Sequence, residues 1–549
     1  MDLTTTAGPP SVPVAPEGDD ISTLPGPGHR PESMVESIAQ SKSNLDDDIL
    51  RAQGHEAAMP RVFSVLSSVG LAFSITNSWI GYLSNFSQNL VYGGPQSVVF
   101  GLIVACAIQW VITLGLSELA SAFPSSGGQY HFVYLIAPEK HKRFAAFLVG
   151  WLSILAWWIV TSSGISLAAA SIVGMASFWD NSWAPQQWQV YVVYVALIVF
   201  TMLPLIFTPR RMPRIVQFTL FATILGFVIT FVVLVATKDY TRAGSSITTP
   251  GQGTSGWDQN TAWLLGVVNA MYAFGATDAA IHIAEEMKEP GKRLPQIMNL
   301  TMLIGLITTL PLVMVMMFGL RDLAAVNAAT LDSAEVFYQI TQSKTTTSVL
   351  MSWLIMCYVS AIPSQWVTSG RIAWAFARDN GVPYSKYFVH IDEKRGFPLR
   401  ATVAAAIFTV FYGLLYLAST SAFNSIVTSA VLFLNLTYAV PQAILLVQGR
   451  EKSLPPRHLN LGKFGYFCNA FSTGWIVVLG ALVCFPPTLP ITLGDMNYTS
   501  IIIVGLFGIV LGFWYTIGRN FEGPTFNWQA LNAANLASAQ EAHIRRVQQ

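Results

Sequence analysis

Two segments place polar side chains in the middle of long apolar stretches, where a helix facing lipid would carry few of them. Residues 74–79 read Ser-Ile-Thr-Asn-Ser-Trp and follow the apolar run Val-Gly-Leu-Ala-Phe. Residues 272–278 read Tyr-Ala-Phe-Gly-Ala-Thr-Asp, so a glycine, a hydroxyl and a carboxylate fall inside one apolar stretch. Because an ionisable residue inside a membrane is costly and usually functional, Asp278 is a candidate contact for a substrate amine or a proton.

The two segments predict interrupted helices that bind a small solute. In transporters built from inverted repeats, the site lies where two helices are broken at corresponding positions, and the unwound backbone supplies free N–H and C=O groups. Aromatic side chains beside the breaks could add cation–π contacts to a quaternary ammonium group. We therefore expect a substrate-binding site formed by Ser74, Ile75, Thr76, Asn77, Ser78, Trp79, Tyr272, Phe274, Gly275, Ala276, Thr277 and Asp278.

Each segment also has a purely structural interpretation. The polar residues of the first could form a helix face against a neighbour, because Ser and Thr also join membrane helices. Thr277 or Asp278 could cap the N-terminus of a second half-helix. The second interpretation still requires a broken helix, so it favours the same architecture.

The composition indicates a protein whose main solvent is lipid. Of the 549 residues, 52% are hydrophobic and only 11% are charged, whereas soluble domains carry about 25% charged residues. The net charge of +1 gives no indication of a nucleic-acid partner. The four cysteines lie in apolar stretches without a CxxC pair, so we expect no disulfide framework and no zinc site. No cofactor is expected either.

Runs without charge, divided by Gly and Pro, predict an all-α polytopic membrane protein of about 12 transmembrane helices. Two spans fall between Arg61 and Glu118, separated by Gly93-Gly94-Pro95. The others are expected in residues 144–179, 186–209, 215–237, about 261 onward past Asp278, 294–320, 345–370, 401–449 (two spans divided near 419–421), 464–494 and 497–518.

Charge placement predicts the orientation of these spans. Lys and Arg are concentrated in one set of alternate loops, at residues 140–143, 210–214, 288–293, 378–400 and 450–463. The other set holds only Lys238, Arg242, Arg321 and Lys344. By the positive-inside rule, both termini are expected to face the cytoplasm.

This map divides the chain into a transporter domain over residues 61–519 and two cytoplasmic tails. Residues 1–60 are expected to be a disordered N-terminal tail because they are rich in Pro, Gly, Ser and Asp. Residues 520–549 form the expected C-terminal tail. Asn497 begins an Asn-Tyr-Thr glycosylation sequon near the outer face, but it lies so close to the last span that its occupancy is doubtful.

Several charged residues fall at predicted cytoplasmic helix ends, where an ionic cluster could close an inner gate or a solvated helix end could simply carry them. The candidates for this gate are Glu118, Glu285, Glu286, Arg371 and Arg378. His282 and Glu285 have helical spacing, but no further ligand lies nearby in the sequence, so no metal site is expected.

The chain resembles the amino acid–polyamine–organocation (APC) superfamily, and within it the fungal amino acid/choline/GABA permeases, over about residues 60–520. The motifs that carry the resemblance are Glu118–Pro124 with Ser126–Tyr130; Ala284-Glu285-Glu286 with Pro290 and Pro295; Arg371 with Trp374–Pro383; residues 74–79; and Phe485-Pro486-Pro487 with Met496-Asn497-Tyr498.

The resemblance implies a LeuT-type fold, a 5+5 inverted repeat plus two C-terminal helices. It also implies proton-coupled uptake of a small amine or amino acid such as choline or GABA, and a plasma-membrane or alternatively vacuolar location. The first break departs from the superfamily in having Ile75-Thr76-Asn77 in place of glycines, which favours a substrate without a carboxylate. The fifth span has no lysine to replace a coupling sodium ion, so sodium is not excluded.

Two other functions remain open. The chain could export a basic, alkaloid-like metabolite, because transport direction follows the gradients. It could also be a nutrient sensor that does not transport, although its expected tails are short for signalling. We do not expect an enzyme, because the sequence shows no paired carboxylates and no nucleophile–base arrangement.

Overall fold

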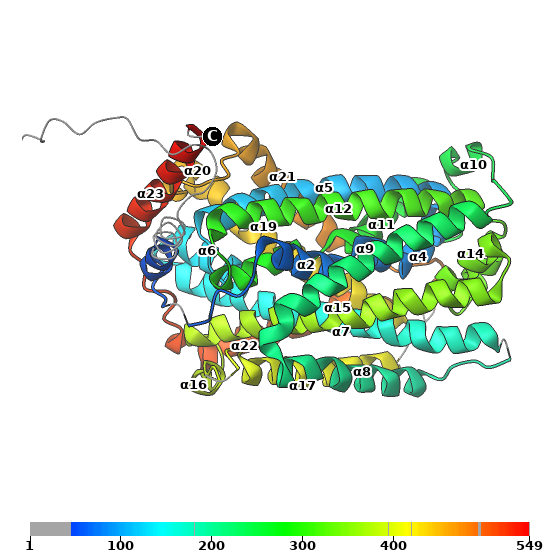
Figure 1. The fold of residues 1–549 in the computed structure, drawn as a ribbon, viewed down its shortest axis with the longest axis horizontal. Coiled ribbons are helices and arrows are strands. Elements are labelled where there is room, and N and C mark those ends of the chain that lie inside the picture. Colours follow the sequence, from blue (N-terminus) through cyan, green and yellow to red (C-terminus); the bar gives the residue numbers. More distant parts are fainter. Residues whose placement is uncertain are drawn as a thin grey trace, which may run out of the picture. The chain divides into compact units, whose positions relative to one another are not determined.

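A computed structural model describes residues 45–56, 58–180, 182–392, 395–418, 420–491 and 496–547 (Figure 1). The residues from Leu45 onward form one compact unit. In the described part of the chain, the regular structure is helical apart from two isolated backbone bridges. The prediction of an all-α polytopic membrane protein is confirmed.

Eleven helical segments of the described residues are long and apolar enough to cross a membrane. A further span is formed by two short helices in succession, α2 (Val65–Thr76) and α3 (Ser78–Leu83), which are followed by α4 (Phe86–Gly93). Together these agree with the expected number of about 12 spans. The eleven are α5 (Pro95–Ala122), α7 (Lys142–Trp179), α8 (Gln187–Phe207), α9 (Met212–Thr237), α11 (Gln259–Ala270) continued by η2 (Met271–Phe274) and η3 (Thr277–Glu286), α12 (Pro290–Gly319), α15 (Lys344–Arg378), α17 (Leu399–Gly413) with α18 (Leu415–Ala418), α19 (Thr420–Gln448), α21 (Gly462–Leu482) and α22 (Thr499–Thr516).

Two spans are interrupted, at the positions that the sequence indicated. The first break lies at Asn77, whose φ of 30° is left-handed and whose N–H donates to the carbonyl of Phe73 at 2.7 Å. The second lies at Gly275 and Ala276, and Ala276 has a φ of 61°. Left-handed backbone is unfavourable for an alanine, so the surrounding contacts must hold this turn. The breaks fall in the first and sixth spans, as two inverted halves of five spans require.

The spans pack in two groups. The broken α2 lies against α9 and α12, while α5 packs between α12 and α11. In the second group, α7, α8, α15 and α17 pack on one another, and α15 also contacts α2 and α9 of the first group. Substrate movement in transporters of this kind rocks one such group against the other, so contacts between the two groups are where gates are expected.

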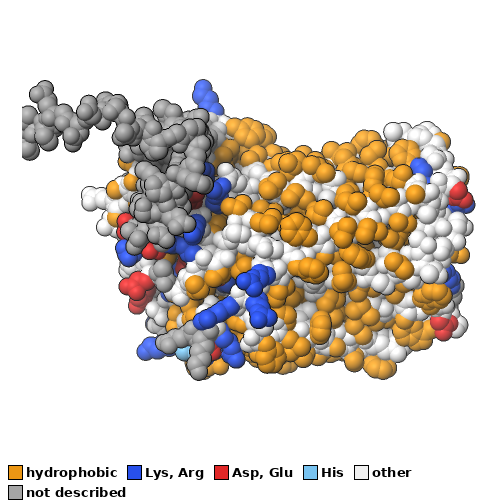
Figure 2. Space-filling view, in the orientation of Figure 1, with side chains coloured by type: hydrophobic (Ala, Val, Ile, Leu, Met, Phe, Trp, Pro, Cys, Tyr) orange, Lys and Arg blue, Asp and Glu red, His pale blue; other side chains and the backbone are white. Residues whose placement is uncertain are grey.

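The outer surface is apolar along the helices and basic near one set of helix ends. Large apolar side chains such as Val199, Phe207 and Phe218 are exposed on α8 and α9, as lipid contact requires. Figure 2 shows hydrophobic side chains along the helices and a concentration of Lys and Arg near one end. We call this the basic end, and the other the opposite end. Residues 140–143, 210–214, 288–293 and 450–463 connect helices at the basic end.

The boundary of the N-terminal tail differs from the prediction. Residues 45–52 are helical, and several of the residues from 45 to 60 pack against the basic end instead of forming part of a plain tail. Asp46 accepts a hydrogen bond from the backbone N–H of Glu289 at 3.0 Å, and Gln53 donates to the carbonyl of Pro124 at 3.4 Å. These contacts come from residues distant in sequence, so local composition could not reveal them.

The C-terminal segment also packs on the basic end. Phe521 and Leu531 are fully buried, and α23 (Trp528–Val547) places Trp528 edge-on against Phe123 with ring centroids 6.1 Å apart. The N–H of Asn527 donates to the carbonyl of Ala52 at 2.8 Å, so the two terminal segments contact each other. The transporter unit therefore extends past both limits, 61 and 519, that composition predicted.

Candidate functional site

A small cavity with a volume of about 50 Å³ lies between the two helix breaks. Thr76 joins the breaks across it, because its hydroxyl donates to the carbonyl of Gly275 at 3.2 Å. The cavity is lined by Ser74, Ile75, Thr76, Asn77, Gly81, Val160, Gly164, Tyr272, Gly275, Ala276, Tyr358, Ala361, Ile362, Gln365, Val431 and Leu434.

Seven of the twelve predicted binding residues line this cavity: Ser74, Ile75, Thr76, Asn77, Tyr272, Gly275 and Ala276. The structure does not bring the other five to its wall, and all of them are buried. Trp79 packs edge-on against Phe227 with ring centroids 6.2 Å apart, and the Thr277 hydroxyl lies 3.0 Å from that of Thr113. Ser78, Phe274 and Asp278 likewise face neighbouring helices.

The residues that the third, eighth and tenth spans contribute to the cavity wall were not predicted from the sequence. Tyr358 and Gln365 on α15 are its polar members, beside Val160 and Gly164 on α7 and Val431 on α19. Tyr358 donates to the carbonyl of Ile80 at 2.7 Å, so its ring is fixed beside the first break. Tyr358 and Val431 lie in largely apolar runs, where no local pattern distinguishes them from packing residues. Gly164 and Gln365 directly follow polar residues inside their spans, Thr161-Ser162-Ser163 and Ser364, and this pattern could have indicated them.

The cavity wall is uncharged but contains free hydrogen-bond acceptors. None of the described lining residues is Asp, Glu, Lys, Arg or His. The Oδ1 atom of Asn77 and the Oε1 atom of Gln365 are buried without a hydrogen-bond partner. Such atoms cost free energy unless a ligand or water satisfies them. With the rings of Tyr272 and Tyr358, they form a surface that attracts the positive end of a solute.

Asp278 lies at the centre of a separate, fully buried network beside the cavity. Its carboxylate accepts hydrogen bonds from the Tyr438 hydroxyl at 2.5 Å and the Gln129 amide at 2.7 Å. The Trp157 indole donates at 3.1 Å, and Nε2 of His282 lies 3.2 Å away. Asp278 thereby ties the sixth span to the third span, the tenth span and α6 (Gln129–Ile136).

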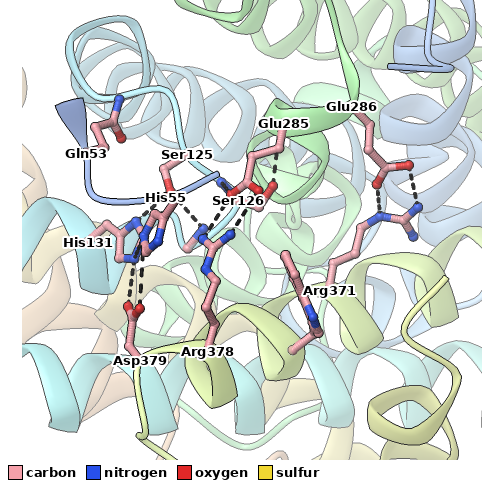
Figure 3. A network of polar contacts seen from close by, with 12 residues as sticks. Gln53, His55, Ser125, Ser126, His131, Glu285, Glu286, Arg371, Arg378 and Asp379 are labelled. Atoms are coloured by element: carbon pink, nitrogen blue, oxygen red, sulfur yellow. Dashed lines mark hydrogen bonds and ion pairs between the residues drawn. The ribbon is translucent and has the colours of Figure 1, made fainter. Parts of the chain in front are cut away.

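Two ion pairs join the sixth and eighth spans at the basic end (Figure 3). Arg371 forms a two-pronged pair with Glu286, in which Nη2 lies 2.7 Å from Oε2. Arg378 forms a second pair with Glu285, with two contacts of 3.0 Å. Because the sixth and eighth spans belong to different packing groups, these four side chains hold the two groups together at this end.

Glu118, the fifth predicted gate residue, lies outside this cluster. It pairs with Arg450 at 2.5 Å and with Arg457 at 2.7 Å. Those arginines lie in the connection between α19 and α21, so Glu118 anchors the second span to that connection. His282 and Glu285 do not form a ligand pair, because Nδ1 of His282 faces the carbonyl of Ser126 at 3.1 Å while Glu285 pairs with Arg378.

A second cavity lies toward the opposite end and shares Tyr272 and Val431 with the first. The first cavity therefore adjoins space at the opposite end, while two ion pairs connect the sixth and eighth spans at the basic end. Asn497 lines the second cavity. Its side-chain nitrogen, the atom that would carry a glycan, donates to the carbonyls of Val483 at 2.8 Å and Phe485 at 2.7 Å, so glycosylation would have to break both bonds.

Comparison with known proteins places this architecture in a family. Residues 63–507 match the amino acid permease family. A choline transporter of Saccharomyces cerevisiae is 30% identical over 496 residues, which cover 89% of this chain and 87% of the relative. Amino-acid permease 2 of Neurospora crassa is 28% identical over 504 residues (90% and 92%), and the transmembrane transporter swnT of Metarhizium robertsii is 27% identical over 467 residues (83% and 91%). The chain belongs to the amino acid permease family of the APC superfamily and is a multi-pass membrane transporter.

Proposed function

We propose that this protein is a secondary active transporter of a small organic amine, with choline as the leading substrate. The observation that carries the proposal is the uncharged cavity at the two helix breaks, with two tyrosine rings and two unpartnered amide oxygens. A quaternary ammonium group has no N–H to donate and binds best to aromatic faces and oxygen dipoles. The choline transporter among the relatives supports the same substrate class.

GABA and amino acids are the alternative substrates. Their carboxylates would need donors, and the described cavity wall offers no Arg, Lys or His. The free backbone N–H groups at the starts of α3 and η3 are the available donors, because helix N-termini attract anions. Choline needs no such partner, so the composition of the wall favours it.

Orientation and coupling complete the proposal. The basic end faces the cytoplasm by the positive-inside rule, so both termini are cytoplasmic and the cavity is reached from outside. The plasma membrane is the proposed location.

Uptake is coupled to a proton, and the Asp278–His282 pair is the proposed carrier because it is an ionisable pair buried within a span. One charge crossing about 100 mV supplies about 2.3 kcal/mol.

The test is uptake of radiolabelled choline, GABA and an amino-acid panel in a permease-deficient yeast that expresses the protein at its surface. Choline uptake that a protonophore abolishes supports both substrate and coupling. Uptake of GABA or an amino acid without choline uptake would overturn the substrate assignment. Uptake that persists with the protonophore and stops when sodium is removed would overturn the assigned ion.

Export of a basic metabolite is the second candidate function. A relative from Arthroderma benhamiae is named a swainsonine transporter and is 26% identical over 462 residues. Reconstituted vesicles distinguish the two directions. Loss of preloaded amine from vesicles when protons are driven inward would indicate an antiporter that exports, whereas accumulation under the same gradient would indicate an importer.

A further inference from the structure

Two histidines and an aspartate meet at the basic end, although 76 and 248 residues separate neighbouring members along the chain. His55 comes from the N-terminal segment that packs against the basic end, His131 from α6, and Asp379 directly follows the last residue of α15. All three are buried, with exposed fractions of 6%, 1% and 5%. Figure 3 shows both imidazoles side by side above the Asp379 carboxylate.

The distances among the three side chains, 2.9–4.0 Å, lie on either side of the ligand–ligand separation in a tetrahedral metal centre. The Nε2 atoms of His55 and His131 are 3.3 Å apart, and Nε2 of His131 is 2.9 Å from Oδ2 of Asp379. The remaining edge, from Nε2 of His55 to Oδ1 of Asp379, is 4.0 Å. A tetrahedral ion with bonds of about 2.0–2.1 Å places its ligand atoms about 3.3 Å apart. The ring centroids, 4.9 Å apart, also agree with two imidazoles whose Nε2 atoms converge on one point.

The surroundings of His131 resemble the support that metal ligands usually receive. Its Nδ1 atom lies 2.5 Å from the Ser125 hydroxyl, which also accepts from the N–H of Gly127 at 3.3 Å. When Nδ1–H donates to Ser125, Nε2 presents its lone pair toward the centre of the cluster. Metal-bound histidines are oriented in this way by a partner on the other ring nitrogen.

The local charges suit a divalent cation. Arg378, next to Asp379 in the chain, is paired with Glu285, which offsets its positive charge. Two neutral imidazoles and an ionised carboxylate are the protonation states that metal binding requires.

We propose that His55, His131 and Asp379 bind a divalent transition-metal ion of the zinc type, with water as its fourth ligand. Two imidazoles and one carboxylate form a typical zinc ligand set, whereas magnesium and calcium prefer oxygen ligands throughout. The bound ion cross-links the N-terminal segment, α6 and the end of the eighth span. It therefore secures the N-terminal segment directly beside the Glu285–Arg378 ion pair. Metal binding itself does not depend on the transport proposal; only the effect on the gate does.

Binding is tested on the purified full-length protein, stripped of metal with a chelator and titrated with zinc sulfate. We expect one zinc ion per chain, and at least about tenfold weaker binding in His55→Ala. His390→Ala is the matched control, because His390 is an exposed histidine in the connection after α15 and should leave binding unchanged. Equal zinc affinity in wild type and His55→Ala, or no zinc bound at micromolar concentration, would overturn the site.

Two further measurements test the proposal even if His55→Ala alters the fold. Cobalt(II) bound to the wild type should give the intense visible absorption of a tetrahedral site, and Asp379→Asn, which keeps the size of the side chain, should lose it. Zinc should also slow backbone hydrogen exchange in residues 45–60 of the wild type. Zinc binding without slower exchange would refute the cross-link, and an octahedral cobalt spectrum would refute the assigned geometry.

Discussion

Arg378 and Glu285 face each other as a two-pronged ion pair at the basic end, with Nη1–Oε2 and Nη2–Oε1 distances of 3.0 Å. Glu285 follows the second helix break by nine residues and is almost fully buried, while Arg378 ends the eighth span. This pair and the neighbouring Glu286–Arg371 pair connect the two packing groups of helices.

Removing one member of this pair should open the basic end. Glu285→Gln leaves the partly buried Arg378 guanidinium without its partner, a change that costs up to about 3 kcal/mol, because breaking a fully buried pair costs about 3–5 kcal/mol. We expect faster hydrogen exchange in residues 125–136. The double variant Glu285→Gln/Arg378→Gln should exchange more slowly than the single variant, because it leaves no unpaired charge.

The control for this gate prediction is Glu139→Gln. Glu139 pairs with Lys142 on the same end of the molecule but is largely exposed, and exposed pairs contribute little. Equal exchange rates in Glu285→Gln and Glu139→Gln would show that the buried pair does not hold the basic end closed.

Asp278→Asn should greatly reduce transport while the protein still reaches the membrane. The substitution removes the charge that accepts hydrogen bonds from Tyr438, Gln129 and Trp157. Losing a hydrogen bond to a charged group costs about 1.5–3 kcal/mol, which corresponds to about ten- to hundredfold in rate. Uptake kinetics across external pH measure the effect, and the remaining uptake should lose its dependence on a proton gradient.

Asp258→Asn is the matched control for this change. Asp258 caps the N-terminus of α11 in the same span but at the opposite end, where its carboxylate accepts from two backbone N–H groups. It should retain proton-dependent uptake. A normal proton dependence in Asp278→Asn would remove that carboxylate from the coupling mechanism.

Substitutions of Tyr272 should separate the contribution of its ring from that of its hydroxyl. The ring lines the cavity, and the hydroxyl lies 3.2 Å from that of Ser163. Tyr272→Phe keeps the cation–π surface and should change the KM for choline little. Tyr272→Leu removes about 0.5–2 kcal/mol of attraction and should raise KM by about two- to thirtyfold. An equal rise in both variants would indicate that the hydroxyl, and not the ring, binds substrate.

Packing of the N-terminal segment should weaken as pH rises through about 6. Burial raises the pKa of Asp46 from 3.8 to about 6, against the opposing effects of the Glu289 N–H and Arg61. Because the pKa is raised in the packed state, the protonated carboxyl stabilises packing fully below pH 3.8, and this contribution is lost as pH rises through 6. At about 1.4 kcal/mol per unit, the full effect is on the order of 3 kcal/mol.

Limited proteolysis of residues 45–60 between pH 4.5 and 7.5 measures this effect. Asp46→Asn stays uncharged and can still accept the Glu289 N–H, so its protection should not change with pH and should exceed that of the wild type at pH 7.5. Asp48→Asn, at an exposed position beside it, should behave as the wild type does. Identical pH profiles for Asp46→Asn and wild type would refute the assignment.

Much of the fold could be predicted from the sequence because each membrane-spanning helix has its own local pattern of apolar residues. A lipid-facing span needs about 20 apolar residues, so charge-free runs located nearly every helix. The two breaks were visible for the same reason, since Asn77 and the stretch ending at Asp278 are polar where lipid forbids exposed polar groups. Glu285, Glu286, Arg371 and Arg378 could be placed at one end by counting residues along their helices.

Only the tertiary structure decided which side chains meet. Asp278 was predicted at the substrate site, but the turn at Ala276 directs it toward Tyr438 and His282, away from the cavity wall. Tyr358 and Gln365 reach the cavity from the middle of the eighth span, where only the cytoplasmic end was predicted to be functional.

His55, His131 and Asp379 lie in three segments that no sequence pattern relates to one another, and His55 falls in the segment that composition predicted to be a tail. The reason is physical: hydropathy records how each residue interacts with its solvent, whereas a binding site depends on which helix faces pack together, and those contacts join residues hundreds of positions apart.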